Sequence, residues 1–105
     1  MFDKTKALDE LELAEDEYDE LLKIFVELAD EQIRGLESAW ASGNVAEARE
    51  LAHSLKGAAG NLRLVDCLAM ASAIELALIE QRNDRIREQL DTLVTAVDEV
   101  RASAG

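Results

Sequence analysis

The chain has 105 residues and a formal net charge of −12 at pH 7, which argues against nucleic acid as a partner because such binding depends on Lys and Arg neutralising phosphates. Hydrophobic residues make up 49% of the sequence, enough for one small domain over residues 1–105, yet no apolar run approaches the ~20 residues that span a bilayer. A single cysteine and no visible signal peptide favour a cytoplasmic protein without membrane association.

The first two predicted elements are a short helix and a long one. Residues 3–13 form the short helix, which covers one end of the fold. Residues 15–42 form the long helix, whose acidic first turn suits the positive end of the helix dipole. Gly35 is interpreted as a tolerated small residue inside it, and Gly43 as a left-handed residue that ends it. The apolar residues that recur at helical spacing and are expected to face inward are Tyr18, Leu21, Leu22, Phe25, Leu28, Ala29, Ile33, Leu36, Ala39 and Trp40.

Three further helices are predicted at residues 45–62, 65–81 and 84–102. Asn44 is a suitable N-cap for the first of them, with Glu47 three residues later as a capping-box-like partner. The connections are too short for parallel neighbours. The pattern therefore predicts an all-α fold, an antiparallel up-down four-helix bundle with a short additional N-terminal helix. The tail at residues 102–105 is expected to fray.

One stretch of the helix at 45–62 combines groups suited to phosphoryl chemistry. Its histidine, His53, is the only one in the chain, and Lys56, Gly57 and Gly60 fall on the same helix face. A glycine inside a helix costs ~1 kcal/mol relative to alanine, so Gly57 is interpreted as leaving an approach path for a large partner. Lys56 would offer a positive charge to phosphoryl oxygens. The apolar residues fall on a different strip: Val45, Ala48, Leu51, Ala52, Leu55, Ala59 and Leu62.

The string HSLKGAAGNL, from His53 to Leu62, resembles the signature of histidine-containing phosphotransfer (HPt) domains, the four-helix relay modules of two-component phosphorelays. The resemblance extends through the rest of the chain. One departure is Arg63, since the family often has glycine at this position, just before a turn. The resemblance implies a monomeric phosphocarrier without its own nucleotide-dependent kinase activity. Its partners would be a histidine kinase and response-regulator receiver domains.

The resemblance also implies a mechanism. His53 would attack an aspartyl phosphate on a receiver domain in line through Nε2, or accept its phosphoryl group from the kinase. The phosphohistidine would then pass that group to the aspartate of a response-regulator receiver. The chain would need no cofactor and no metal site of its own, because the receiver would contribute Mg²⁺.

Glu75 is a charged residue on the inward stripe of the helix at 65–81, 22 residues after His53. At ~1.5 Å rise per residue, the two stand at nearly equal height on either side of the turn near residues 63–64. HPt domains that resemble this chain often have Gln or Glu here, in contact with the imidazole. Glu75 would accept the Nδ1 proton and leave Nε2 free to attack. The alternative is that Glu75 extends to solvent at the edge of the helix pair.

Four residues are candidates for partner binding. Gly57 and Gly60 present bare backbone on the histidine face. Arg49, one turn before the histidine, could add positive charge at the rim of the site, although an ordinary helix salt bridge to a neighbouring glutamate explains it equally well. Asn61 could cap the helix or contact the receiver.

Several alternative interpretations compete with phosphotransfer. A lone histidine in a small helical domain is by itself more often incidental than reactive, and Lys56 could be a solvated surface lysine. A nucleotide-dependent enzyme is disfavoured because the chain has no glycine-rich phosphate loop, and Cys67 with a single histidine lacks a metal ligand set. The remaining alternative is a non-catalytic helical adaptor that binds receiver or kinase domains, in which glutamine could replace His53 without loss.

Overall fold

The computed structural model describes residues 2–105 and contains α1 (Lys4–Leu11), α2 (Glu15–Ala41), α3 (Val45–Asn61), α4 (Val65–Ile79) and α5 (Asn83–Ser103). The described residues contain no β-strand, so the expected all-α fold with a short N-terminal helix is confirmed. None of these five helices is long and apolar enough to cross a membrane.

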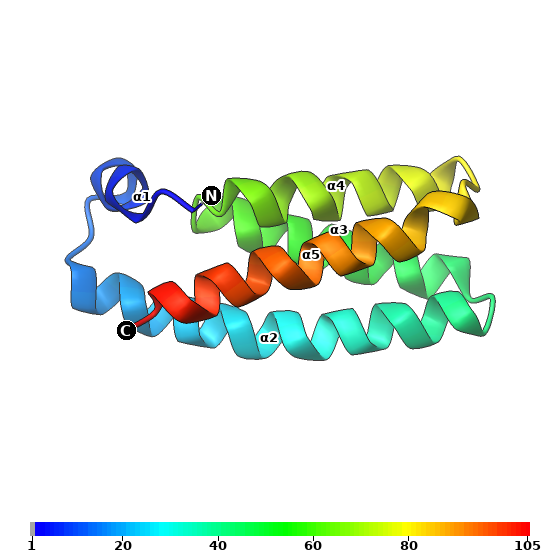
Figure 1. Ribbon diagram of the computed structural model, residues 1–105, viewed down its shortest axis with the longest axis horizontal. Coiled ribbons are helices and arrows are strands. Elements are labelled where there is room, and N and C mark those ends of the chain that lie inside the picture. The colour runs from blue at the N-terminus through cyan, green and yellow to red at the C-terminus, as the bar shows by residue number, and fades with distance from the viewer. Residues whose placement is uncertain (1) are drawn as a thin grey trace.

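The four long helices lie lengthwise beside one another, and α1 crosses the end of the group at which α2 begins (Figure 1). Each long helix packs against the next one in the chain, and α2 also packs against α5. The connections between the long helices are three residues each, and Figure 1 shows the chain reversing its direction at each of them.

All three of these connections use the same left-handed turn. A residue just beyond each helix end has a positive φ, namely Gly43 (81°), Arg63 (60°) and Gln81 (58°). The next amide donates to a carbonyl five residues back, as Leu64 N does to Ala59 O at 2.9 Å. This pattern satisfies carbonyls that a helix end would leave without partners. The expected left-handed Gly43 is confirmed, and Arg63 adopts a conformation for which glycine is best suited.

The core is formed by one face of each long helix. The apolar residues that recur at helical spacing along α5, from Ile86 to Val100, are buried. Among residues 2–105 no charged side chain is fully buried. Removing this apolar surface from water is the main favourable contribution to folding. The largest side chains with essentially no exposure are Tyr18, Leu22, Leu36, Leu55, Leu64, Ile74, Ile86, Leu90 and Leu93.

Some residues expected inside are exposed. Leu21 and Leu28 are each 37% exposed, because they lie at the edge of the apolar stripe of α2, which packs mainly against α3 and α5 among the long helices. Val45 is 40% exposed, as the first residue of α3. The interpretation of Gly35 as merely tolerated is also incomplete, because a Cβ there would lie 3.1 Å from Leu51 Cδ1. A side chain at this position would push against α3.

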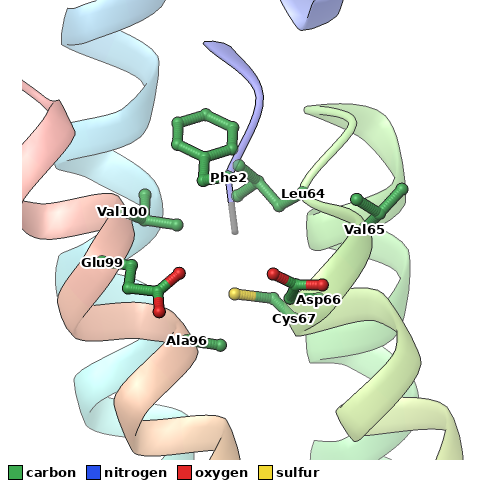
Figure 2. A pocket seen from close by; sticks show the side chains of 8 residues that line it. All are labelled: Phe2, Leu64, Val65, Asp66, Cys67, Ala96, Glu99 and Val100. Carbon is green, nitrogen blue, oxygen red and sulfur yellow. The ribbon is translucent and has the colours of Figure 1, made fainter.

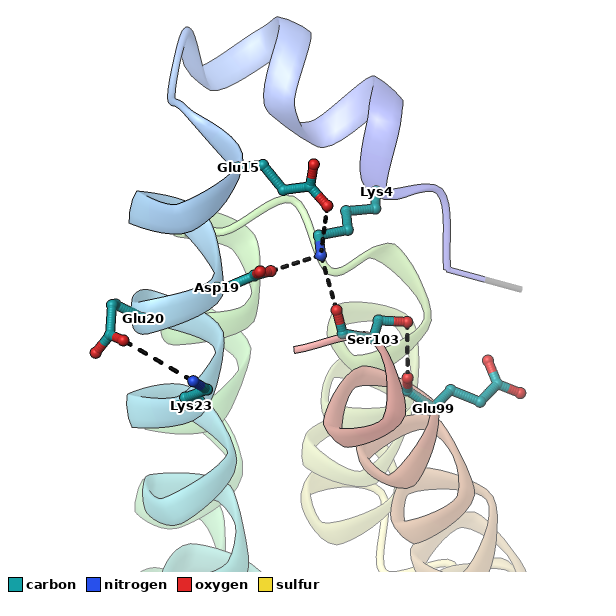
Figure 3. Close-up of polar contacts among 7 residues, drawn as sticks. All are labelled: Lys4, Glu15, Asp19, Glu20, Lys23, Glu99 and Ser103. Atoms are coloured by element: carbon teal, nitrogen blue, oxygen red, sulfur yellow. Dashed lines mark hydrogen bonds and ion pairs between the residues drawn. The ribbon is translucent and has the colours of Figure 1, made fainter. Parts of the chain in front are cut away.

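Polar contacts tie α1 to the end of the bundle. Lys4 Nζ donates to Ser103 O at 2.8 Å and forms an ion pair with Asp19 (Figure 3). On the other side of α1, Arg63 Nε donates to Glu10 Oε2 at 3.1 Å. The expectation of a frayed tail is wrong, because α5 continues to Ser103 and the next residue is only 5% exposed.

The same end of the bundle buries two groups that titrate at high pH. Cys67 lies beneath Phe2 and Leu64, and the three side chains line a cavity of about 10 Å³ (Figure 2). Burial raises the pKa of the Cys67 thiol to about 12, so the thiol is protonated and unreactive near neutral pH. Burial likewise raises the pKa of Tyr18 to about 12, and its hydroxyl donates to Leu62 O at the end of α3.

Gln81→Gly is expected to raise the free energy of unfolding by about 0.5–1 kcal/mol relative to Gln81→Ala, because glycine adopts a positive φ without the steric cost of a Cβ. Gln81 suits the test because its side chain is exposed and makes no hydrogen bond to any residue from 2 to 105. Urea unfolding followed by circular dichroism measures the difference. Equal stability of the two variants would contradict the expectation.

Candidate functional site

His53 lies in the middle of α3, on the strip that faces solvent. Its side chain is 70% exposed, whereas Ala52, Leu55 and Ala59 on the opposite strip have no exposed surface. The start of α3 is fixed by Asn44, whose side chain accepts from the backbone N–H of Glu47, as expected for this cap. The predicted division of α3 into a histidine strip and a core strip is therefore confirmed, apart from the exposed first residue.

The carboxylate of Glu75 joins His53 and Lys56. Glu75 Oε2 lies 2.9 Å from His53 Nδ1, and Lys56 Nζ donates to Glu75 Oε1 at 2.6 Å. The side chain of Glu75 is only 19% exposed, so the alternative in which it extends to solvent is wrong. With its Nδ1 hydrogen directed to this carboxylate, the imidazole keeps its Nε2 lone pair for chemistry.

The electrostatics of this cluster favour the charged form of Glu75. The hydrogen bond from Lys56 holds the pKa of the Glu75 carboxyl below its ordinary value of 4.5, with partial burial opposing and His53 adding to the shift. The unfolded chain lacks these contacts. They therefore contribute stability above the ordinary pKa, and this contribution is lost as the pH falls through the lowered one.

The surface beside the histidine is bare backbone. A Cβ added at Gly57 would meet no atom within 4 Å, and one at Gly60 would make only an ordinary contact with Leu68 at 3.8 Å. Neither glycine is therefore needed for packing within residues 2–105. Asn61 is exposed as the last residue of α3. The residue that caps the C-terminal end of α3 is Leu62, which does so by donating its own backbone N–H, and not the side chain of Asn61.

An open hollow of about 440 Å³ adjoins the imidazole, and its lining is Ala46, Arg49, Glu50, His53, Ser54 and Glu75. Arg49 makes no ion pair with any residue from 2 to 105, so the expected alternative of a helix salt bridge to a neighbouring glutamate is wrong. Its charge stays available on the histidine face. Lys56 does not line the hollow.

One polar pair at the edge of the site was not anticipated from the sequence. Gln32 of α2 donates through Nε2 to Ser54 Oγ at 2.8 Å, which fixes the face of α2 that lies beside the histidine strip. The sequence indicates only that Gln32 lies one helical turn after Leu28 and so shares its face of α2. A pattern on one helix cannot identify its partner on another.

The arrangement can therefore present a nucleophilic nitrogen to a large partner. Among residues 2–105 no group of three or more His, Cys, Asp or Glu side chains could hold a metal ion. The described part of the chain thus supplies an exposed imidazole, an oriented carboxylate, two cations and open backbone. Such a set positions a nucleophile and can stabilise added negative charge.

The comparisons with known proteins give one finding. The family model described as Hpt domain matches residues 20–103, which include all four long helices except the first residues of α2. No curated protein and no solved structure matches the chain.

Glu75→Ala is expected to lower the share of neutral imidazole that carries its proton on Nδ1, because the acceptor 2.9 Å away is removed. The ¹⁵N chemical shifts of the ring, recorded above the pH at which the imidazole deprotonates, distinguish the two tautomers. Glu50→Ala is the matched control, since it removes the same charge from the same hollow. Unchanged ring shifts in Glu75→Ala would show that this contact does not select the tautomer.

Proposed function

The chain belongs to the Hpt domain family, and from this we propose that it is a phosphorelay intermediate whose phosphorylated residue is His53. Membership implies phosphotransfer in two-component signalling. Hpt domains are phosphocarriers rather than kinases, and they interact with kinase and receiver domains. The observation that carries the assignment of His53 is its 70% exposed imidazole, held at Nδ1 by Glu75.

In the proposed reaction, the Nε2 lone pair of His53 attacks the phosphorus of an aspartyl phosphate on a receiver domain or accepts the group from a kinase. The N–P bond forms as the P–O bond to the aspartate breaks, and the aspartate carboxylate leaves with the bonding electrons. The proton stays on Nδ1, so the phosphorylated ring carries a positive charge. The Glu75 carboxylate at 2.9 Å stabilises this cation. Transfer to a second receiver reverses these steps.

The carrier needs no nucleotide and no metal of its own in this proposal. The receiver supplies the Mg²⁺ that neutralises charge on the transferring group, while Lys56 and Arg49 add positive charge on the carrier's side. Positioning is the carrier's main contribution, because phosphoryl transfer gains most from alignment and electrostatic stabilisation. The chain as a whole is acidic, and its net charge of −12 opposes self-association and fits a monomer.

Exposed apolar residues beside the histidine fit a docking surface for the receiver. Gln32 contacts Ser54, so this face of α2 lies beside the histidine strip of α3. Leu28 and Leu21 fall on the same face of α2 at helical spacing, and each is 37% exposed. A receiver that covers these leucines reaches the imidazole across the open backbone at Gly57. Gly60 and Asn61 lie on the same approach.

The architecture supports the same proposal. Contacts of each long helix with the next, and of α2 with α5, support an antiparallel up-down four-helix bundle with α3 on its surface. We place this carrier in the cytoplasm, where receiver domains and kinase domains meet it. The adaptor alternative needs neither the contact between Glu75 and His53 nor the open surface at Gly57. An adaptor would keep its function when the histidine is substituted, whereas a phosphorelay intermediate would lose it.

His53→Gln is expected to abolish phosphorylation while retaining the fold, because glutamine has no nucleophilic nitrogen and the side chain is exposed. The measurement is incubation with a phosphorylated receiver domain, followed by a test for label that is acid-labile and base-stable. Wild-type protein provides the positive control, and circular dichroism checks folding. Label that persists in His53→Gln would reject His53 as the phosphorylated residue.

Gly57→Leu is expected to slow transfer from a receiver at least tenfold, because the leucine side chain fills the approach path, while helicity is retained or rises. Reaction with phosphoramidate, a small phosphoryl donor, should stay near the wild-type rate, since this donor does not cover the surface of α3. The comparison of the two donors separates partner approach from chemistry. Wild-type transfer from the receiver would show that Gly57 has no role in approach.

A further inference from the structure

The two cations near His53 are not equivalent. Lys56 Nζ donates to Glu75 Oε1 at 2.6 Å, so its charge already balances the carboxylate that holds the imidazole. Arg49 has no ion pair with any residue from 2 to 105 and lines the hollow beside His53. The cation with an uncommitted charge is therefore the arginine.

Arg49 lies one helical turn before His53, and both residues line the same hollow. Arg49 and His53 are four residues apart and share one face of the helix. Side chains on a helix lean toward its N-terminus, so the imidazole leans over the turn that carries Arg49. Nδ1 is directed to Glu75 on α4, which leaves Nε2 as the ring nitrogen able to face the hollow.

The charge balance of the hollow changes when a phosphoryl group enters it. Such a group carries roughly −1.5 to −2 charge near pH 7, and the carboxylates of Glu50 and Glu75 line the same hollow. Lys56 offsets only one of these negative charges. Without a further cation, the added group would face repulsion from the carboxylate of Glu50, which lines the same hollow.

We propose that Arg49 is the phosphoryl-binding residue of the site and donates hydrogen bonds from its guanidinium to the phosphoryl oxygens on Nε2. Lys56 then acts mainly as a positioning residue that holds the Glu75 carboxylate. The inference rests on the proposed function, because it assigns a ligand to the group that His53 carries. Guanidinium suits this task, since its planar donors can bind two oxygens of one phosphoryl group.

Phosphoramidate tests the inference, because this small donor reports on the phosphoryl site without receiver docking. Arg49→Gln is expected to slow phosphorylation of His53 about tenfold, corresponding to one lost charge-assisted contact, while Arg49→Lys restores part of the rate. Arg85→Gln on α5 is the matched control, because it removes the same charge away from the hollow. Circular dichroism checks that each variant is folded.

A second readout reports on the phosphoryl group directly. In ³¹P NMR of the phosphorylated protein, Arg49→Gln should raise the pH at which the phosphoryl group takes up a proton, since a nearby cation favours the dianion. Arg85→Gln should leave that pH unchanged. If Arg49 had only a structural role outside the hollow, Arg49→Gln would leave the protonation pH of the phosphoryl group unchanged.

The outcomes separate the inference from the function beneath it. Wild-type phosphoramidate kinetics and an unchanged ³¹P titration in Arg49→Gln would overturn the inference, even if transfer from a receiver slowed, because Arg49 would then serve docking alone. Absence of label on His53 in the wild-type protein with a phosphorylated receiver would instead reject the proposed function.

Discussion

The site depends on one carboxylate that serves two neighbours. Glu75 accepts from Lys56 at 2.6 Å and lies 2.9 Å from His53 Nδ1. Both partners project from α3, whereas the carboxylate comes from α4, so the contact spans the interface between two helices. A partly buried acceptor of this kind is stable only with its partners in place. The orientation of the imidazole is therefore a property of helix packing rather than of α3 alone.

That packing is set by the turn between the two helices. Arg63 takes a positive φ of 60°, and the amide of Leu64 donates to Ala59 O, which ends α3 and starts α4 within three residues. An added residue in α4 would rotate Glu75 by about 100° and move it ~1.5 Å along the axis. Either change removes the carboxylate from the imidazole. Contacts of the Arg63 side chain with Gly60 O and Glu10 help a non-glycine residue to hold this conformation.

Much of this arrangement could be predicted from residue spacing. Helical periodicity located the five helices, and equal distances from the turn placed Glu75 level with His53. The exposure of Leu21 and Leu28 could not be predicted, because a wide apolar stripe does not reveal which of its edges a neighbour covers. The same limit applies to Gly35, whose close contact with Leu51 depends on the distance between two helices. Partners on different helices become known only from the packed structure.

The buried hydroxyl of Tyr18 makes the stability of this fold decrease at high pH. The phenol ionises near its ordinary pKa of 10.0 in an unfolded chain but near 12 in the bundle, so stability present below the first value is lost as the pH rises toward the second. A phosphorus–nitrogen bond is preserved by base and cleaved by acid. The conditions that prolong the life of a phosphorylated histidine are thus the ones that begin to loosen the end of α3, where Tyr18 holds the carbonyl of Leu62.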